Sequence, residues 1–179
     1  TEEEFAIQAN YFAIIGIVAI IAGGRYELAV VLPKSKSKAI NLIGLATGIT
    51  AIVSILSLSL LFFYPQIERL YETAELTKYL PYISLGILLT SLVAILTNWL
   101  IRQKKYKTIS SLKIIQSLAI NIITLGFGYL NFGTDGLIFG WIIGQTLALI
   151  FLYFSFRKDF DYKLISKKEM GEVAKDYKE

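Results

Sequence analysis

The residues best suited to chemistry lie in a charged break between two apolar segments. Residues 5–24 form an uncharged run, and Arg25 and Glu27 follow it directly. The pair Gly23-Gly24 stands just before them and weakens a helix by about 1 kcal/mol per glycine. A charge at membrane depth or at the membrane edge is costly, so a function is the first hypothesis for it. The equally weighted alternative is a helix that simply ends here, with an arginine that reaches toward the interface.

Long uncharged runs dominate the rest of the chain. Of the 179 residues, 55% are hydrophobic and 18% are charged, whereas soluble domains are closer to one quarter charged. About 20 apolar residues span a bilayer core. Each run is that long or longer, so the sequence predicts an all-α, polytopic membrane protein with about five transmembrane helices. The expected spans are residues 5–24, 39–63, 81–101, 112–130 and 136–156.

Cysteine and histidine are both absent from the sequence. Disulfide bonds, thiolate catalysis, imidazole metal sites and histidine general bases are therefore excluded in this chain. We expect no metal, no cofactor and no enzymatic role.

The basic residues are divided unequally between alternate loops. Of the 18 lysines and arginines, 16 fall in the first break, in the loop after the third run and in the tail, whereas 2 fall between the second and third runs. This distribution is a topology signal, not a nucleic-acid-binding one, and it predicts that the basic loops and the tail are cytoplasmic. The chain would then start outside, without a visible signal peptide, so we expect it to be a fragment that has lost an earlier span. Residues 1–156 would form a partial N-terminal transmembrane bundle, and residues 157–179 a charged cytoplasmic tail or linker.

Polar residues inside the spans mark faces that should avoid lipid. Asn98 follows Ser84 and Ser91 at intervals of seven, and Asn121 and Gln145 lie in the next two runs. An asparagine in hydrocarbon favours a partner, so Asn121 is expected to face protein or water. Two series of glycines spaced by four predict close helix packing. They are Gly44 with Gly48, and Gly136 with Gly140 and Gly144.

Three segments resemble the bacterial polysaccharide-unit flippases, which include the O-antigen and exopolysaccharide translocases. They are EEF at residues 3–5, GRYELAVVLPK at residues 24–34 and GLIFGWIIGQ at residues 136–145. This family belongs to the multidrug/oligosaccharidyl-lipid/polysaccharide exporter superfamily. The similarity covers essentially the whole chain, as spans two to six of a protein with twelve to fourteen spans. The first span and the second bundle of the family have no counterpart here, so this chain alone is not expected to transport.

The resemblance implies movement of undecaprenyl-diphosphate-linked oligosaccharide across the bacterial inner membrane by alternating access. Arg25 would then contact the anionic head of the cargo, because a guanidinium forms two parallel hydrogen bonds to a phosphate. Glu27 would serve a gate or ion coupling. Asn98, Asn121 and Gln145 would line the cavity. The expected partners are the bilayer, the lipid-linked oligosaccharide and the missing remainder of the chain, and not nucleic acid.

Three alternatives remain open. A drug or cation antiporter of the same superfamily would need acidic groups inside the spans, and the uncharged runs contain none. A non-transporting membrane scaffold would not need polar faces. An integral glycosyltransferase would need acidic residues at the membrane surface; Glu68, Glu72 and Glu75 are helically spaced and indicate a solvated face instead.

Overall fold

The chain folds into helices. The computed structural model describes residues 2–63, 78–157 and 159–177, and no strand occurs among them. In these residues five helices are long and apolar enough to cross a membrane, which confirms the prediction of an all-α polytopic protein. They are α1 (Glu2–Ala22), α3 (Lys36–Ser57), α6 (Leu80–Arg102), α7 (Tyr106–Tyr129) and α8 (Gly133–Phe156).

Four shorter helical segments complete the description. They are α2 (Tyr26–Ala29), α9 (Lys167–Asp176) and the 3₁₀ turns Leu58–Phe63 and Tyr162–Leu164. The glutamates at positions 68, 72 and 75 lie outside the described residues. The division into a bundle at residues 1–156 and a tail at residues 157–179 stays a prediction.

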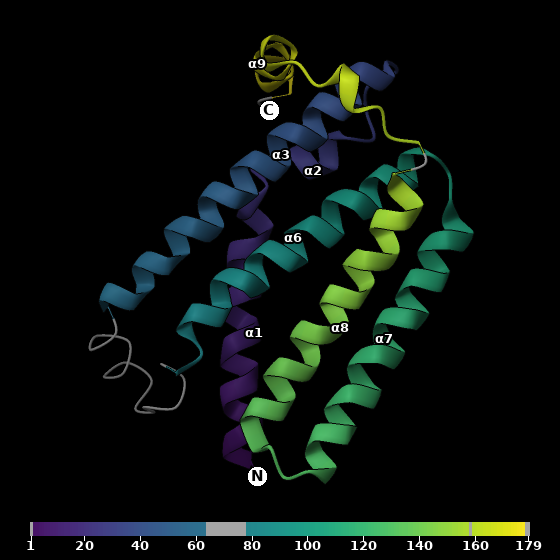
Figure 1. The fold of residues 1–179 in the computed structure, drawn as a ribbon. Coiled ribbons are helices and arrows are strands. Elements are labelled where there is room, and N and C mark those ends of the chain that lie inside the picture. The colour runs from purple at the N-terminus through teal and green to yellow at the C-terminus, as the bar shows by residue number, and fades with distance from the viewer. Residues whose placement is uncertain (1, 64–77, 158, 178–179) are drawn as a thin grey trace.

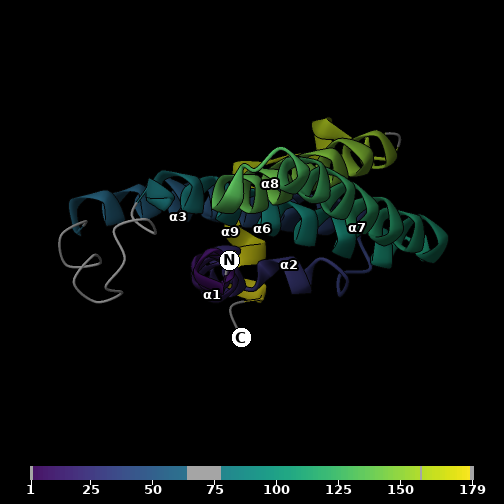
Figure 2. The same ribbon diagram turned by 90° about the horizontal axis from the view of Figure 1, so that it is seen from below.

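The long helices form a layer with one helix laid against it. In the layer α6 packs between α3 and α8, and α7 packs on the far side of α8. Seen from below in Figure 2, α1 and α2 lie on one face of this layer. Helix α1 contacts α6, α8 and α3, so α6 is the central helix of the arrangement.

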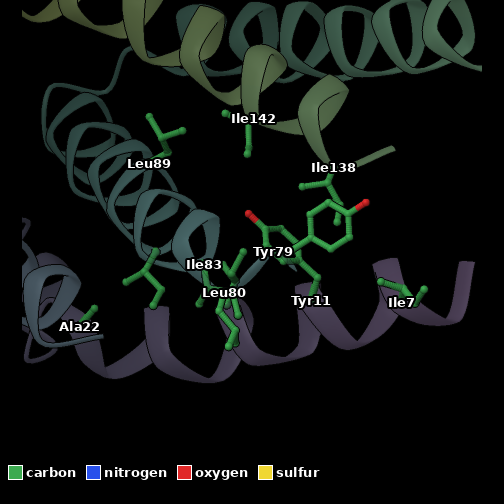
Figure 3. Close-up of a cluster of buried hydrophobic side chains, with 11 residues drawn as sticks. Ile7, Tyr11, Ala22, Tyr79, Leu80, Ile83, Leu89, Ile138 and Ile142 are labelled. Atoms are coloured by element: carbon green, nitrogen blue, oxygen red, sulfur yellow. The ribbon is translucent and has the colours of Figure 1, made fainter. Parts of the chain in front are cut away.

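An apolar cluster joins α1 to the layer. Ile7, Tyr11 and Ile15 repeat every four residues, which places them on one face of α1. Figure 3 shows Tyr11 of α1 near Leu80 of α6, with Ile7 one turn away along α1. Ile83 of α6 and Ile138 and Ile142 of α8 belong to the same cluster. The buried hydroxyl of Tyr11 donates to the carbonyl of Tyr82 at 2.9 Å. Apolar side chains also cover the outer face of α1, where Ile17, Ile20 and Ile21 are exposed, as expected for a helix in contact with lipid.

The glycine series of α8 lets α7 approach it closely, which confirms that prediction. A Cβ at Gly140 would stand 2.6 Å from the hydroxyl oxygen and 3.0 Å from the Cα of Thr124, on α7. A Cβ at Gly136 would stand 2.7 Å from the Cβ of Phe127, and one at Gly144 would collide with Ile120. The first glycine series, Gly44 with Gly48, does not bring two of the five long helices into close contact, so the prediction of close packing there is wrong for the transmembrane helices. Gly44 faces Met170 of α9, and the space beside Gly48 is open.

The basic segments gather at one end of the bundle (Figure 1). The guanidinium of Arg102 donates to the carbonyls of Pro33, Lys34 and Ser35, which joins the first basic loop to the second. Lys105 pairs with Asp159, which joins the second loop to the tail. These contacts place the basic segments together at the same end of the bundle, as the charge distribution predicts. Which side of the membrane they face stays a prediction.

Asp135 lies at the opposite end. Because it opens a helix in the sequence, a capping role is the natural expectation. The structure corrects it: the cap residue of α8 is Phe132, and Asp135 lies in the first turn. Its carboxylate accepts hydrogen bonds from Lys78 at 2.8 Å and from the hydroxyl of Tyr79 at 2.5 Å. Asp135 therefore ties the start of α8 to the start of α6.

Candidate functional site: a polar groove across α6

The charged break forms a sharp elbow. Helix α1 ends at Ala22, and both Gly24 and Arg25 take left-handed backbone angles, with φ of 60° at each. Glycine adopts this conformation freely, whereas for arginine it costs about 1 kcal/mol. Arg25 caps α2 through its backbone position, and its side chain is exposed. The elbow therefore turns the chain and places Arg25 and Glu27 beside α6.

A hollow of about 420 Å³ lies between the elbow, α1 and α6. Arg25, Glu27 and Leu28 line it from the elbow side, and Gly16 lines it from α1. The α6 side presents Thr90, Ser91, Ala94 and Asn98. One carboxylate oxygen of Glu27 is buried here and lies against the backbone of Gly23, where a Cβ would collide with it. Because Gly23 has no side chain, it leaves room for the Glu27 carboxylate in this position.

A second hollow, of about 340 Å³, opens on the other side of the same α6 residues. Thr90, Ala94 and Asn98 line both hollows, and their spacing of four places them on one face of α6. From the far side Lys113 and Gln116 of α7 and Gln145 of α8 complete the lining. We call the two hollows together the polar groove.

The groove contains buried polar atoms that lack a hydrogen-bond partner. They are one carboxylate oxygen of Glu27 and the hydroxyl oxygens of Thr90 and Ser91. A buried polar atom left unpaired costs about 1–3 kcal/mol, so such atoms favour a water or a ligand as their partner. The amides on the far side are paired with each other instead: the side chain of Gln116 donates to that of Gln145 at 2.8 Å.

Four of the five predicted site residues meet in this groove, namely Arg25, Glu27, Asn98 and Gln145. Asn121 is not among its lining residues. Its side chain is exposed on α7 and donates to the carbonyl oxygen of Ser117 at 2.8 Å, so its own helix satisfies it. Asn121 therefore has a hydrogen-bond partner in its own helix and does not need one from another helix or from water.

Sequence reasoning missed Lys113 and Gln116. Lys113 was counted among the loop cations that set the topology, but it lies in α7, with its ammonium 3.5 Å from the amide oxygen of Gln116. Their spacing of three places both on one face of a helix, and this spacing is the signal that points to them. A cation therefore lines each side of Asn98: Arg25 in the first hollow and Lys113 in the second.

The fold and this groove define a multi-pass helical membrane protein with a polar site between its helices. A family model described as "Polysaccharide biosynthesis protein" matches residues 1–174. The chain belongs to this family, which confirms the resemblance found in the sequence and gives it a role in polysaccharide biosynthesis or transport. Neither a curated protein nor a solved structure matches the chain.

Proposed function

We propose that this chain is part of a flippase that moves undecaprenyl-diphosphate-linked oligosaccharide repeat units across the bacterial inner membrane. The observation that carries the proposal is the polar groove, because it combines cations with buried, unpartnered polar atoms in a bundle of membrane-type helices. The family membership supports a polysaccharide cargo. The basic end of the bundle would face the cytoplasm.

The groove has the chemistry for a diphosphate joined to a sugar. The guanidinium of Arg25 suits a phosphate through two parallel hydrogen bonds, and the ammonium of Lys113 adds a second positive charge. The side chain of Asn98 lies between them and offers both a donor and an acceptor to sugar hydroxyls. We infer that a second bundle, contributed by the complete protein, covers the groove and alternates its access.

Glu27 supports a second candidate function. Its carboxylate lines the hollow, and one oxygen is buried without a partner. An acidic group in this position is what a drug or cation antiporter of the same superfamily would use to exchange ions. In the flippase proposal the same carboxylate serves a gate or the coupling ion. A pure scaffold would have no use for the groove, and we infer that the protein is not an enzyme.

Export by the complete protein distinguishes these functions. The gene would be expressed in a bacterium that lacks its own flippase but still makes the repeat unit. We expect surface polysaccharide to be restored and the lipid-linked repeat unit to stop accumulating. Efflux of a cationic dye without any restored polysaccharide would support the antiporter instead. If the protein showed neither activity, the scaffold function would be supported.

The substitution Lys113→Gln tests the second hollow. We expect cargo export to fall about tenfold, because a hydrogen bond to a charged group contributes about 1.5–3 kcal/mol. The matched control is Lys107→Gln, which removes the same charge from an exposed position near the start of α7, outside the groove. Equal export by both variants would remove Lys113 from the site.

The substitution Gly23→Ala tests the placement of Glu27. A Cβ at Gly23 would meet the Glu27 carboxylate, so the carboxylate should be displaced and export should fall severalfold. Gly16→Ala is the control, since Gly16 lines the same hollow with open space beside it, and alanine there also favours the helix. Full export by Gly23→Ala, measured at equal protein levels, would show that the carboxylate position does not matter.

A further inference from the structure

The C-terminal helix α9 is attached to α3 by a buried polar cluster that plays no part in the groove. At its centre is Asn41, a fully buried side chain. The amide nitrogen of Asn41 donates to the carbonyl of Leu164 at 2.9 Å and to the carboxylate of Glu169 at 2.8 Å. Its amide oxygen accepts from the backbone nitrogen of Ser166 at 2.9 Å. One asparagine of α3 therefore binds the segment that leads into α9 and the first turn of α9 itself.

Further contacts fix the position of α9. The carboxylate of Glu169 also accepts a hydrogen bond from the hydroxyl of Ser37. Near the other end of α9, Lys38 pairs with Asp176 at 2.8 Å. On the apolar side Val173 is 1% exposed and belongs to the cluster that contains Ala29 and Val30. A buried polar cluster whose members are bonded to one another favours a single docked position.

Docking of α9 reaches the elbow. The hydroxyl of Tyr26 donates to the carbonyl of Ala174, in α9, at 3.1 Å. Tyr26 stands between Arg25 and Glu27 in the chain, and Val173 packs in the same cluster as Ala29 at the end of α2. Helix α9 thus contacts the segment that carries both charged groups of the first hollow.

We propose that Asn41 and Glu169 are positioning residues: they dock α9 on α3, and docked α9 holds the elbow so that Arg25 and Glu27 face α6. The consequence for export rests on the proposed function, whereas the coupling between α9 and the elbow does not. Since coupling between two sites is reciprocal, loosening α9 must loosen the elbow, and loosening the elbow must loosen α9.

Hydrogen exchange on the complete protein tests the first direction. We expect Glu169→Ala to speed amide exchange about tenfold both in α9 and in residues 26–30, since it removes two hydrogen bonds to a carboxylate. Glu169→Gln should restore slow exchange, because its amide oxygen still accepts. Glu172→Ala is the control, since it removes the same charge from an exposed position of α9. Exchange in α8 should not change, which excludes general destabilisation.

The second direction uses Tyr26→Phe, which removes only the hydroxyl that contacts Ala174. We expect faster exchange in α9, and no such change in Tyr162→Phe, where the tyrosine is exposed. Faster exchange confined to α9 in Glu169→Ala, or an unchanged α9 in Tyr26→Phe, would overturn the coupling. If both variants behave as expected but Arg25→Ala exports normally, the coupling stands and the proposed function fails.

Discussion

Export of the glycan is expected to fall more than about 100-fold when Arg25 is replaced by alanine in the complete protein, with membrane insertion intact. The side chain lines the first hollow and would form two charged hydrogen bonds to the diphosphate, each of about 1.5–3 kcal/mol. Accumulated lipid-linked repeat unit and surface polysaccharide measure the effect. Arg25→Lys should lose less, about tenfold, because an ammonium keeps the charge but not the paired geometry.

The backbone of Arg25 offers a control that separates function from folding. Its φ of 60° disfavours arginine and alanine alike but suits glycine. Arg25→Gly should therefore be as stable as the original protein, or about 1 kcal/mol more stable, and still fail to export. Full export by Arg25→Ala or Arg25→Gly would rule out the role assigned to the guanidinium.

Replacement of Gly140 by alanine is expected to destabilise the bundle by about 1–3 kcal/mol. The new Cβ would stand 2.6 Å from the hydroxyl oxygen and 3.0 Å from the Cα of Thr124. A side-chain rotation can relieve the first contact, but only a shift of α7 can relieve the second. Thermal unfolding in detergent should show a midpoint lowered by several degrees.

Gly128→Ala is the matched control for this prediction. Gly128 lies in α7, the helix that faces Gly140, and has open space around it. Alanine there should leave the midpoint unchanged or raise it, since alanine favours a helix by about 1 kcal/mol over glycine. Equal midpoints for the two variants would mean that α7 and α8 do not pack as closely as the structure shows.

The elbow shows what local sequence can reveal. Consecutive glycines weaken any helix, and charges are costly inside a membrane span, so a break near residue 24 was predictable. Helix α1 ends two residues earlier, at Ala22. Close packing of another helix on α8 was predictable for a similar reason, although the sequence did not identify α7 as that helix. Three glycines spaced by four form a flat strip on α8, and an approaching helix fills such a strip.

The site residues show what the local sequence cannot predict. Asn121 and Gln145 have the same polarity and lie in neighbouring spans, yet Gln145 lines the groove and Asn121 does not. Lys113 follows a cluster of loop cations, and its charge alone assigns it to the topology signal. The rotation of α7 and of α8 about their own axes decides which of these residues face α6, and packing along each whole helix sets that rotation.

The sequence by itself determined that the chain is a set of apolar membrane-type helices, where they break, and which loops share a side. These properties follow from run length, glycine content and charge, which each segment carries alone. Only the tertiary structure decided that Arg25 and Lys113 line hollows on either side of Asn98, and that the tail docks beside the elbow. Both depend on how helices are rotated against one another, and side-chain packing between segments distant in sequence sets that rotation.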